Sequence, residues 1–193
     1  MRIGVVDYEA GNLRSVETAL RAIEADFLIS DKPEPLLETD RLVFPGVGDA
    51  NAAMRVLERS GLADAVRRFF EEGKLVLGIC VGSQIVLEAS EENDARCLGL
   101  IPGTARRFPA DMGLKVPHMG WNQVTPADGT SFYFARSYYP DPEREEDRLP
   151  TCEYGITFAA GVQRGNLTAV QFHPEKSGEA GLRLLRNFAS MAE

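Results

Sequence analysis

The stretch Leu75-Val76-Leu77-Gly78-Ile79-Cys80-Val81-Gly82-Ser83-Gln84 changes its hydrophobic pattern halfway along. Residues 75–79 form a short apolar run typical of a buried strand, and residues 81–89 follow a helical pattern. Glycines flank the cysteine between them, and glycine lets a backbone turn sharply without clashes of Cβ atoms. The sequence therefore predicts a strand, a tight turn that carries Cys80, and a helix.

The rest of the first half repeats this alternation. Three further apolar runs predict strands, at residues 3–7, 27–29 and 42–44. Residues 13–23, with Asn12 as the N-cap, and residues 62–72, which stop at Gly73, predict amphipathic helices. Short apolar strands between such helices are typical of a parallel sheet covered on both faces.

The second half predicts antiparallel strands joined by polar turns, at residues 99–108, 121–125, 132–138 and 152–162. A hairpin turn at residues 163–166 leads into a strand at 167–172, and a last helix covers residues 179–191. Residues 141–148 are charged and contain proline, so we expect an exposed loop. No repeat or long linker divides the chain, which predicts one mixed α/β domain over residues 1–193.

Composition excludes several classes of function. The 193 residues are 44% hydrophobic and 26% charged, as in ordinary globular proteins, and no apolar run could span a bilayer. The net charge of −8, without a basic cluster, argues against a nucleic-acid partner. The three cysteines lack the paired spacing of disulfide frameworks or zinc sites. We expect a soluble cytoplasmic protein without a bound metal.

Cys80 is the candidate nucleophile. A turn of this kind holds the side chain above the strand end, and the following helix N-terminus favours the reactive thiolate. A buried structural cysteine in a glycine-bounded turn is the alternative.

A thiolate nucleophile needs a base, and the chain has two histidines. His173 lies at the end of a predicted strand, and Glu175 is close enough in sequence to orient its imidazole. Cys80, His173 and Glu175 therefore form a candidate triad, although a surface histidine beside a turn proline is possible for His173 alone. No carboxylate follows His118, which we interpret as structural or interfacial, with a second base as the alternative.

The loop Phe44-Pro45-Gly46-Val47-Gly48 follows the third predicted strand. Its glycines allow backbone amides to approach a ligand closely, so the loop could supply a donor to an oxyanion. A Pro-Gly-x-Gly turn is nevertheless common, and this loop alone would not identify a site.

These segments together resemble the class I (triad) glutamine amidotransferases, a flavodoxin-like α/β family with a mainly parallel central sheet. Longer matches resemble, within that class, the glutaminase subunits of imidazole glycerol phosphate synthase from histidine biosynthesis. The matching segments run in the family's order along nearly the whole chain: Gly11-Asn12-Leu13-Arg14-Ser15-Val16, residues 44–48, residues 78–84, Pro117-His118-Met119-Gly120-Trp121-Asn122, Tyr133-Phe134, Ser137-Tyr138-Tyr139 and Gln171-Phe172-His173-Pro174-Glu175-Lys176-Ser177.

The resemblance implies roles that spacing does not give. Cys80 would attack the glutamine carboxamide to form a glutamyl thioester, His173 would shuttle protons, and Glu175 would orient it. The amides of Val81 and Val47 would stabilise the oxyanion, the second after a peptide rearrangement. The positions implied to hold glutamine are Gly46, Gly48, Gln84, Ser137 and Tyr138.

The resemblance also implies a partner and no cofactor. The partner would be a (β/α)₈ cyclase that forms a heterodimer with this chain and receives the ammonia through a channel. It would convert a phosphoribulosyl-aminoimidazole substrate to imidazole glycerol phosphate and an aminoimidazole carboxamide ribotide. Trp121, Met119 and the Asn12 loop are the candidate contacts, and a buried packing role for Trp121 is the alternative.

The chain departs from the family's usual pattern at a few positions. Arg136 stands where histidine often precedes Ser-Tyr, Asp49-Ala50 replaces a small-aromatic pair, and Val81 and Ser83 replace bulkier apolar residues. None is a member of the triad, but the partner surface and the ammonia route could differ.

Three other readings remain open from the sequence. The chain could be a triad glutaminase that serves another synthase, such as one for pyridoxal phosphate or amino sugars. It could be a hydrolase of the related peptidase-like cysteine superfamily, or a non-catalytic interaction subunit that kept the fold. A further hypothesis is that the Gly46-Val47 amide points away from the site until the partner binds its own substrate.

Overall fold

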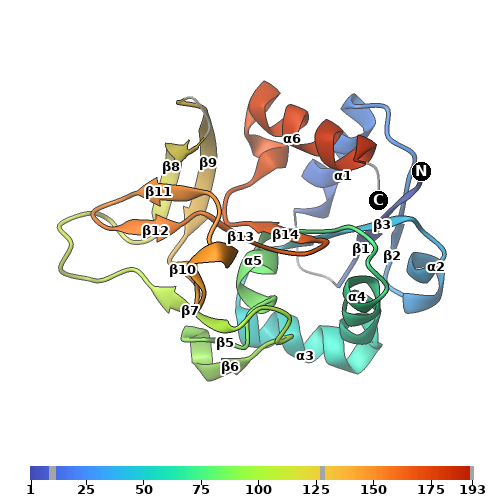
Figure 1. The fold of residues 1–193 in the computed structure, drawn as a ribbon, viewed down its shortest axis with the longest axis horizontal. Helices are drawn as coiled ribbons and strands as arrows, with labels where there is room; N and C mark the ends of the chain where they lie inside the picture. Colours follow the sequence, from blue (N-terminus) through green and yellow to red (C-terminus); the bar gives the residue numbers. More distant parts are fainter. Residues whose placement is uncertain (9–11, 127–128, 192–193) are drawn as a thin grey trace.

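The computed structural model describes residues 1–8, 12–126 and 129–191, and Gly11 of the first matching segment lies outside them. Figure 1 shows a central sheet between two helical layers, with a smaller β region at one end. The central strands lie in the order β13 (Gly161–Arg164), β14 (Leu167–Val170), β4 (Val76–Cys80), β3 (Arg41–Gly46), β1 (Ile3–Val6) and β2 (Phe27–Ser30). All neighbours are parallel except β13 and β14. The mainly parallel α/β fold is therefore confirmed.

Helices cover both faces of this sheet. Helices α1 (Leu13–Ala22) and α6 (Gly178–Ser190) pack on one face, where Val43 and Leu77 point. The other face, with Leu42 and Phe44, carries α2 (Pro33–Leu37), α3 (Ala50–Ser60), α4 (Leu62–Glu71) and α5 (Val81–Ile85). Strand side chains alternate between the two faces, so a sheet buried on both sides has strands that are apolar throughout.

The smaller β region contains two four-stranded sheets. One has the order β10 (Tyr138–Pro142), β7 (Gly103–Arg107), β5 (Ala89–Ser90) and β6 (Ala95–Arg96). The other has the order β12 (Thr157–Ala159), β11 (Thr151–Glu153), β8 (His118–Thr125) and β9 (Ser131–Arg136). Most neighbours are antiparallel, as predicted, and a cluster of aromatic side chains packs between β9 and the end of β14. Short 3₁₀ turns occupy η1 (Glu92–Asp94), η2 (Glu145–Asp147) and η3 (Pro174–Lys176).

Several local predictions were wrong. The helix expected over residues 81–89 ends at Ile85, because the amides of residues 98–101 donate to the carbonyls of residues 85–87. Helix α3 was not predicted, although Asp49 caps it by accepting from the amide of Ala52 at 2.7 Å. The strand expected at 99–108 begins later, at Gly103. The strand expected at 132–138 divides into β9 and β10, and the strand expected at 152–162 divides into β11, β12 and β13.

The segment 141–148 is not simply an exposed loop. Asp147 is buried and accepts from Arg164 of the β13–β14 hairpin at 2.8 Å. This ion pair ties the segment to the central sheet.

Arg41, at the start of β3, is a fully buried cation. Its guanidinium donates to the carbonyl of Phe188 in α6 and, at 3.0 Å, to the carbonyl of Met191 just beyond that helix. These two carbonyls satisfy part of the buried guanidinium, whose Nε has no acceptor among the described residues, and they fix the end of α6 against the sheet. No helix among the described residues is long and apolar enough to span a membrane.

Candidate active site

Cys80 ends β4 in a strained backbone conformation. Its φ of 56° and ψ of −107° are unusual for any residue with a side chain, and such a conformation costs of order 1–3 kcal/mol. A Cβ on Gly78 would lie 2.8 Å from the Cβ of Ala169, and one on Gly82 would lie 2.5 Å from the carbonyl oxygen of Phe44. The two glycines therefore make the tight turn possible, as the sequence predicted.

His173 and Glu175 lie beside this turn at the end of the neighbouring strand β14. The Nδ1 atom of His173 is 2.7 Å from Oε1 of Glu175, and both side chains are almost completely buried. Burial alone would lower the pKa of His173, but hydrogen bonds to Cys80 and Glu175 and their charges outweigh it and raise this pKa to about 9. The imidazole is therefore held between thiol and carboxylate, and an imidazolium is stabilised there.

Asn12 was interpreted as a helix cap, but its side chain makes no capping hydrogen bond. Instead its amide donates to Oε1 of Glu175 and lies 3.5 Å from Nδ1 of His173. The only sequence signal for this role was the position of Asn12 in a matching segment, because 163 residues separate it from Glu175.

Val47 and Val81, the two predicted oxyanion donors, flank the nucleophile from different elements. Val81 is the first residue of α5, so its amide belongs to the helix N-terminus, where N–H groups lack intrahelical acceptors. Val47 follows Gly46, which lies opposite Cys80 in the β3–β4 register. Val47 and Gly48 also line a cavity of about 220 Å³ that includes Tyr8.

Tyr8 was missed by the sequence analysis. Its buried hydroxyl finds no hydrogen-bond partner among residues 1–8, 12–126 and 129–191, and burial raises the pKa of the phenol. A Cβ on Gly46 would lie 2.0 Å from this hydroxyl oxygen, so Tyr8 packs directly under the Gly46 backbone.

The residues predicted to hold glutamine are close to one another. Gln84 is fully buried, and its Nε2 donates to Gln171 Oε1 at 2.8 Å and to the carbonyl of Tyr138 at 3.3 Å. Ser137 connects β9 to β10, and its carbonyl accepts from the amide of Phe108 at 3.0 Å. Gly48 and Gln84 are bridged by Arg136, a residue noted in the sequence only as a departure from the family.

Gln171 was also missed as a site residue. Its Nε2 lies 3.8 Å from the sulfur of Cys80, and its Oε1 accepts from Gln84. The available signal was a glutamine inside the mainly apolar strand predicted at 167–172, because buried amides usually make specific hydrogen bonds.

His118 does not join the triad. It is buried, and its ring stacks between those of Tyr154 and Phe134, with ring centres 3.8 Å and 4.6 Å away. Burial lowers the pKa of His118 to about 4. The structural interpretation is therefore confirmed. Burial raises the pKa of the Cys97 and Cys152 thiols to about 12. No cluster of side chains that could bind a metal ion occurs within the described ranges.

Residues 4–192 match the family Glutamine amidotransferase class-I. A relative from Gloeobacter violaceus, named imidazole glycerol phosphate synthase subunit HisH, is 44% identical over 98% of this chain and 89% of its own length. A relative from Arabidopsis thaliana, named imidazole glycerol phosphate synthase hisHF, chloroplastic, is 42% identical over 96% of this chain, which spans 33% of that longer protein.

A solved structure described as a glutamine amidotransferase superimposes with a TM-score of 0.74 over 98% of this chain and 99% of its own, at 22% identity. That likeness supports the fold alone. The sequence match over almost the whole length and the near relatives carry the assignment: this chain belongs to the class-I glutamine amidotransferases and, among them, to the family of the imidazole glycerol phosphate synthase subunit HisH.

Proposed function

We propose that this chain is the glutaminase subunit of an imidazole glycerol phosphate synthase, and that Cys80, His173 and Glu175 hydrolyse glutamine to glutamate and ammonia. The observation that carries the proposal is the buried Cys80–His173–Glu175 arrangement, with the imidazole held between thiol and carboxylate. Glutaminase activity is the activity of the family to which the chain belongs.

The chemistry follows from the different partners of the two ring nitrogens of His173. Nδ1 faces Glu175, so Nε2 is left to exchange a proton with Cys80. The thiolate attacks the carboxamide carbon, and the amides of Val81 and Val47 stabilise the developing oxyanion. His173 then protonates the leaving nitrogen, ammonia departs, and a glutamyl thioester remains. Water, deprotonated by His173, attacks the thioester and releases glutamate and the thiol.

The Gly46–Val47 peptide is the proposed control point. Gly46 has no Cβ, so its backbone can adopt dihedrals that other residues reach only with strain. In our proposal its amide is misdirected in the isolated chain and turns toward the thiol when the partner has bound its substrate. Full activity of the isolated chain would contradict this proposal.

The partner in our proposal is a (β/α)₈ cyclase that forms a heterodimer with this chain and receives the ammonia. It would use the ammonia to form imidazole glycerol phosphate and the carboxamide ribotide. Met119 and Trp121 of β8 are 63% and 59% exposed, so the packing alternative for Trp121 was wrong. The neighbouring strand contributes Tyr133, whose carbonyl accepts from the amide of His173 at 2.9 Å. Two exposed apolar side chains on β8, which pairs with the strand that contacts His173, support docking on this face.

Because the nucleophile has to remain a thiol, we propose a reducing compartment such as the cytoplasm as its setting.

The test is glutamate release from glutamine by this chain mixed with a cognate cyclase and the cyclase substrate. Cys80→Ala should abolish release, whereas Cys97→Ala, a control at a cysteine outside the site, should retain it. No release by the unaltered protein, in spite of binding to the cyclase, would reject the proposal. Release stimulated only by the synthase of another pathway would favour the alternative partner.

A second test addresses the docking face. Trp121→Ala should weaken binding to the cyclase by roughly 10-fold or more, as expected for a large aromatic anchor. Leu114→Ala is the control, because Leu114 is an exposed apolar residue outside β8. Equal loss for both variants, or for neither, would argue against docking on this face.

A further inference from the structure

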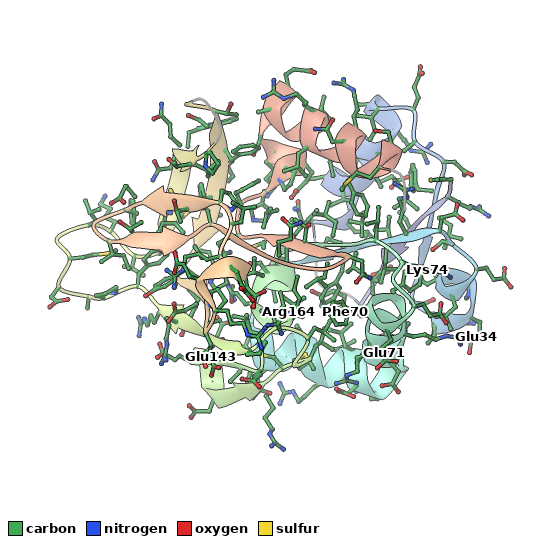
Figure 2. All side chains as sticks on the ribbon, viewed as in Figure 1. Glu34, Phe70, Glu71, Lys74, Glu143 and Arg164 are labelled. Atoms are coloured by element: carbon green, nitrogen blue, oxygen red, sulfur yellow. The ribbon has the colours of Figure 1, made fainter. Side chains whose placement is uncertain are left out.

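A buried tyrosine hydroxyl lies beside the loop that carries one of the proposed oxyanion donors. Tyr8 follows β1 and is 4% exposed. Figure 2 shows the side chains that fill the space between α3 and the central sheet, and the Tyr8 ring belongs to this cluster, with its centre 5.7 Å from that of Phe44. The hydroxyl contacts the backbone of Gly46, because a Cβ on Gly46 would lie 2.0 Å from the hydroxyl oxygen.

This hydroxyl makes no hydrogen bond in the observed conformation with any of residues 1–8, 12–126 and 129–191. Burial raises the pKa of the phenol, so the hydroxyl keeps its proton near neutral pH and is able to donate. A buried polar group without a partner costs free energy, and phenylalanine would fill the same volume without that cost. The Tyr8 hydroxyl is therefore a donor whose acceptor has to come from another conformation of its surroundings.

The order of the strands places Tyr8 and Cys80 on opposite sides of the Gly46–Val47 peptide. Strand β3 ends at Gly46 and lies between β4, which ends at Cys80, and β1, which ends two residues before Tyr8. The carbonyl and the N–H of a trans peptide point in opposite directions. When the N–H turns toward the thiol on the β4 side, the Gly46 carbonyl turns toward the β1 side, from which Tyr8 comes.

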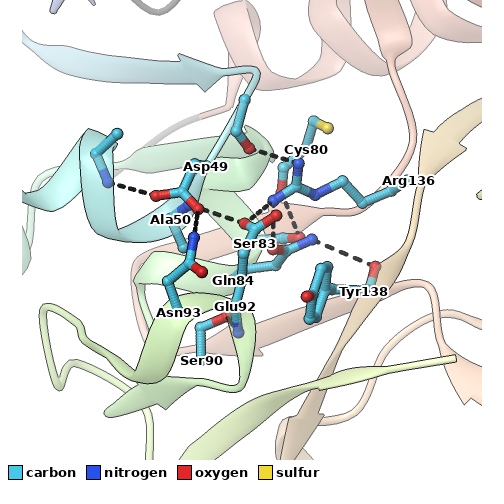
Figure 3. Close-up of polar contacts among 12 residues, drawn as sticks. Asp49, Ala50, Cys80, Ser83, Gln84, Ser90, Glu92, Asn93, Arg136 and Tyr138 are labelled. Carbon is cyan, nitrogen blue, oxygen red and sulfur yellow. Dashed lines mark hydrogen bonds and ion pairs between the residues drawn. The ribbon is translucent and has the colours of Figure 1, made fainter.

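The loop is fixed beyond this peptide and has space beside it. The carbonyl of Gly48 accepts from Arg136, whose guanidinium pairs with Glu92 (Figure 3). Only Val47 lies between this fixed point and the end of β3. Val47, Gly48 and Tyr8 line the cavity of about 220 Å³, which leaves room for the backbone to rotate. Rotation is therefore confined to the short stretch of backbone next to the Tyr8 hydroxyl.

We propose that the Tyr8 hydroxyl donates to the Gly46 carbonyl once the Gly46–Val47 peptide has turned its amide toward Cys80. This inference rests on the proposed glutaminase function and on the control point proposed for that peptide. Tyr8 acts as a positioning residue, because it stabilises the conformation in which the Val47 amide can bind the oxyanion. Without the hydroxyl, the rotated carbonyl would be buried beside an apolar ring and the active conformation would be less populated.

Two competing explanations are that the hydroxyl only fills core volume or that it contacts glutamine directly. The three explanations predict different kinetics when the hydroxyl is removed. A space-filling group changes neither kcat nor KM, and a group that contacts glutamine raises KM. A group that stabilises the active peptide lowers kcat alone, because a smaller share of the molecules has the Val47 amide in place.

The experiment measures glutamate release by the complex with the cyclase, with and without the cyclase substrate. Tyr8→Phe should lower kcat without the cyclase substrate by about 5- to 100-fold, as expected for a buried carbonyl that has lost its donor, and leave KM for glutamine nearly unchanged. With the cyclase substrate, which favours the active peptide, the loss should be equal or smaller. Tyr154→Phe is the matched control and should retain both parameters, because the Tyr154 hydroxyl donates to the carbonyl of Lys115 at 2.7 Å, away from the triad.

Alkylation of Cys80 by iodoacetamide provides a second readout. The thiolate displaces iodide and forms a C–S bond without an oxyanion, so the reaction depends on Cys80 and His173 but not on the Val47 amide. Tyr8→Phe should therefore alkylate at the rate of the unaltered chain, followed at Cys80 by mass spectrometry. Alkylation slowed as much as kcat would place the defect at the thiol and overturn the proposal.

An unchanged kcat for Tyr8→Phe, or a raised KM with kcat unchanged, would overturn the role of Tyr8 and leave the glutaminase proposal standing. If the unaltered complex releases no glutamate even with the cyclase substrate, the proposed function itself fails and the inference fails with it.

Discussion

The side-chain amide of Asn12 donates to Oε1 of Glu175, the same carboxylate oxygen that lies 2.7 Å from Nδ1 of His173. The carboxylate that orients the imidazole is thus itself oriented from the opposite end of the chain. Asn12 has a φ of 64°, a left-handed conformation that asparagine adopts more readily than most residues. Its conformation and its contact with Glu175 together suggest that Asn12 positions the triad.

Asn12→Ala should lower kcat for glutamate release by about 10- to 100-fold, because a supporting hydrogen bond to a site residue is lost. The KM for glutamine should change little, since the observed Asn12 contacts are with Glu175 and His173. Steady-state kinetics in the complex with the cyclase would measure both. Asn187→Ala, at an exposed asparagine of α6, should behave like the unaltered protein. An unchanged kcat for Asn12→Ala would contradict the positioning role.

The two histidines should titrate at opposite ends of the pH scale. Partners raise the pKa of His173 to about 9, and burial lowers that of His118 to about 4. NMR of protein labelled at histidine should therefore give two well-separated titration curves. Glu175→Gln removes a negative charge that raises the His173 pKa, so only the upper curve should move, toward lower pH. Two curves near 6.5, the ordinary value, would refute the environments described for both residues.

The lowered pKa of His118 should make the fold sensitive to acid. The unfolded chain binds a proton at this residue near pH 6.5, whereas the folded protein does so only near pH 4. The contribution of neutral His118 to stability is therefore fully present above pH 6.5 and is lost as the pH falls through 4. His118→Phe should lose less stability between pH 7 and pH 4 in urea denaturation. A parallel loss in both proteins would argue against this source of acid sensitivity.

Gly46→Ala should reduce the free energy of unfolding by about 1–3 kcal/mol, because its Cβ would lie 2.0 Å from the hydroxyl oxygen of Tyr8. Tyr8→Phe removes that oxygen and should recover part of the loss, although Val81 Cβ would still be 3.0 Å away. Tyr8→Phe alone should be nearly neutral, since the hydroxyl has no partner among the described residues. Denaturation of the two single variants and the double variant gives the coupling energy, and additive effects would contradict the steric argument.

The sequence predicted those features that depend on local pattern. The run before Cys80 and its flanking glycines were sufficient for the strand, the turn and the start of α5. The end of α5 was missed because it depends on hydrogen bonds from residues 98–101, which the local periodicity does not contain. For the same reason the contacts of Asn12 with Glu175 and of Arg136 with Gly48 could not be predicted, since each joins distant segments.

The buried guanidinium of Arg41 has a practical consequence for protein engineering. Its acceptors at Phe188 and Met191 are backbone carbonyls, so they depend on where the chain runs and not on which side chains follow. A truncation before Met191 would leave part of a buried cation without acceptors, and a change of Phe188 would in addition remove a buried ring that packs on the guanidinium. A linker that joins this chain to a second enzyme in one polypeptide should therefore begin beyond Met191.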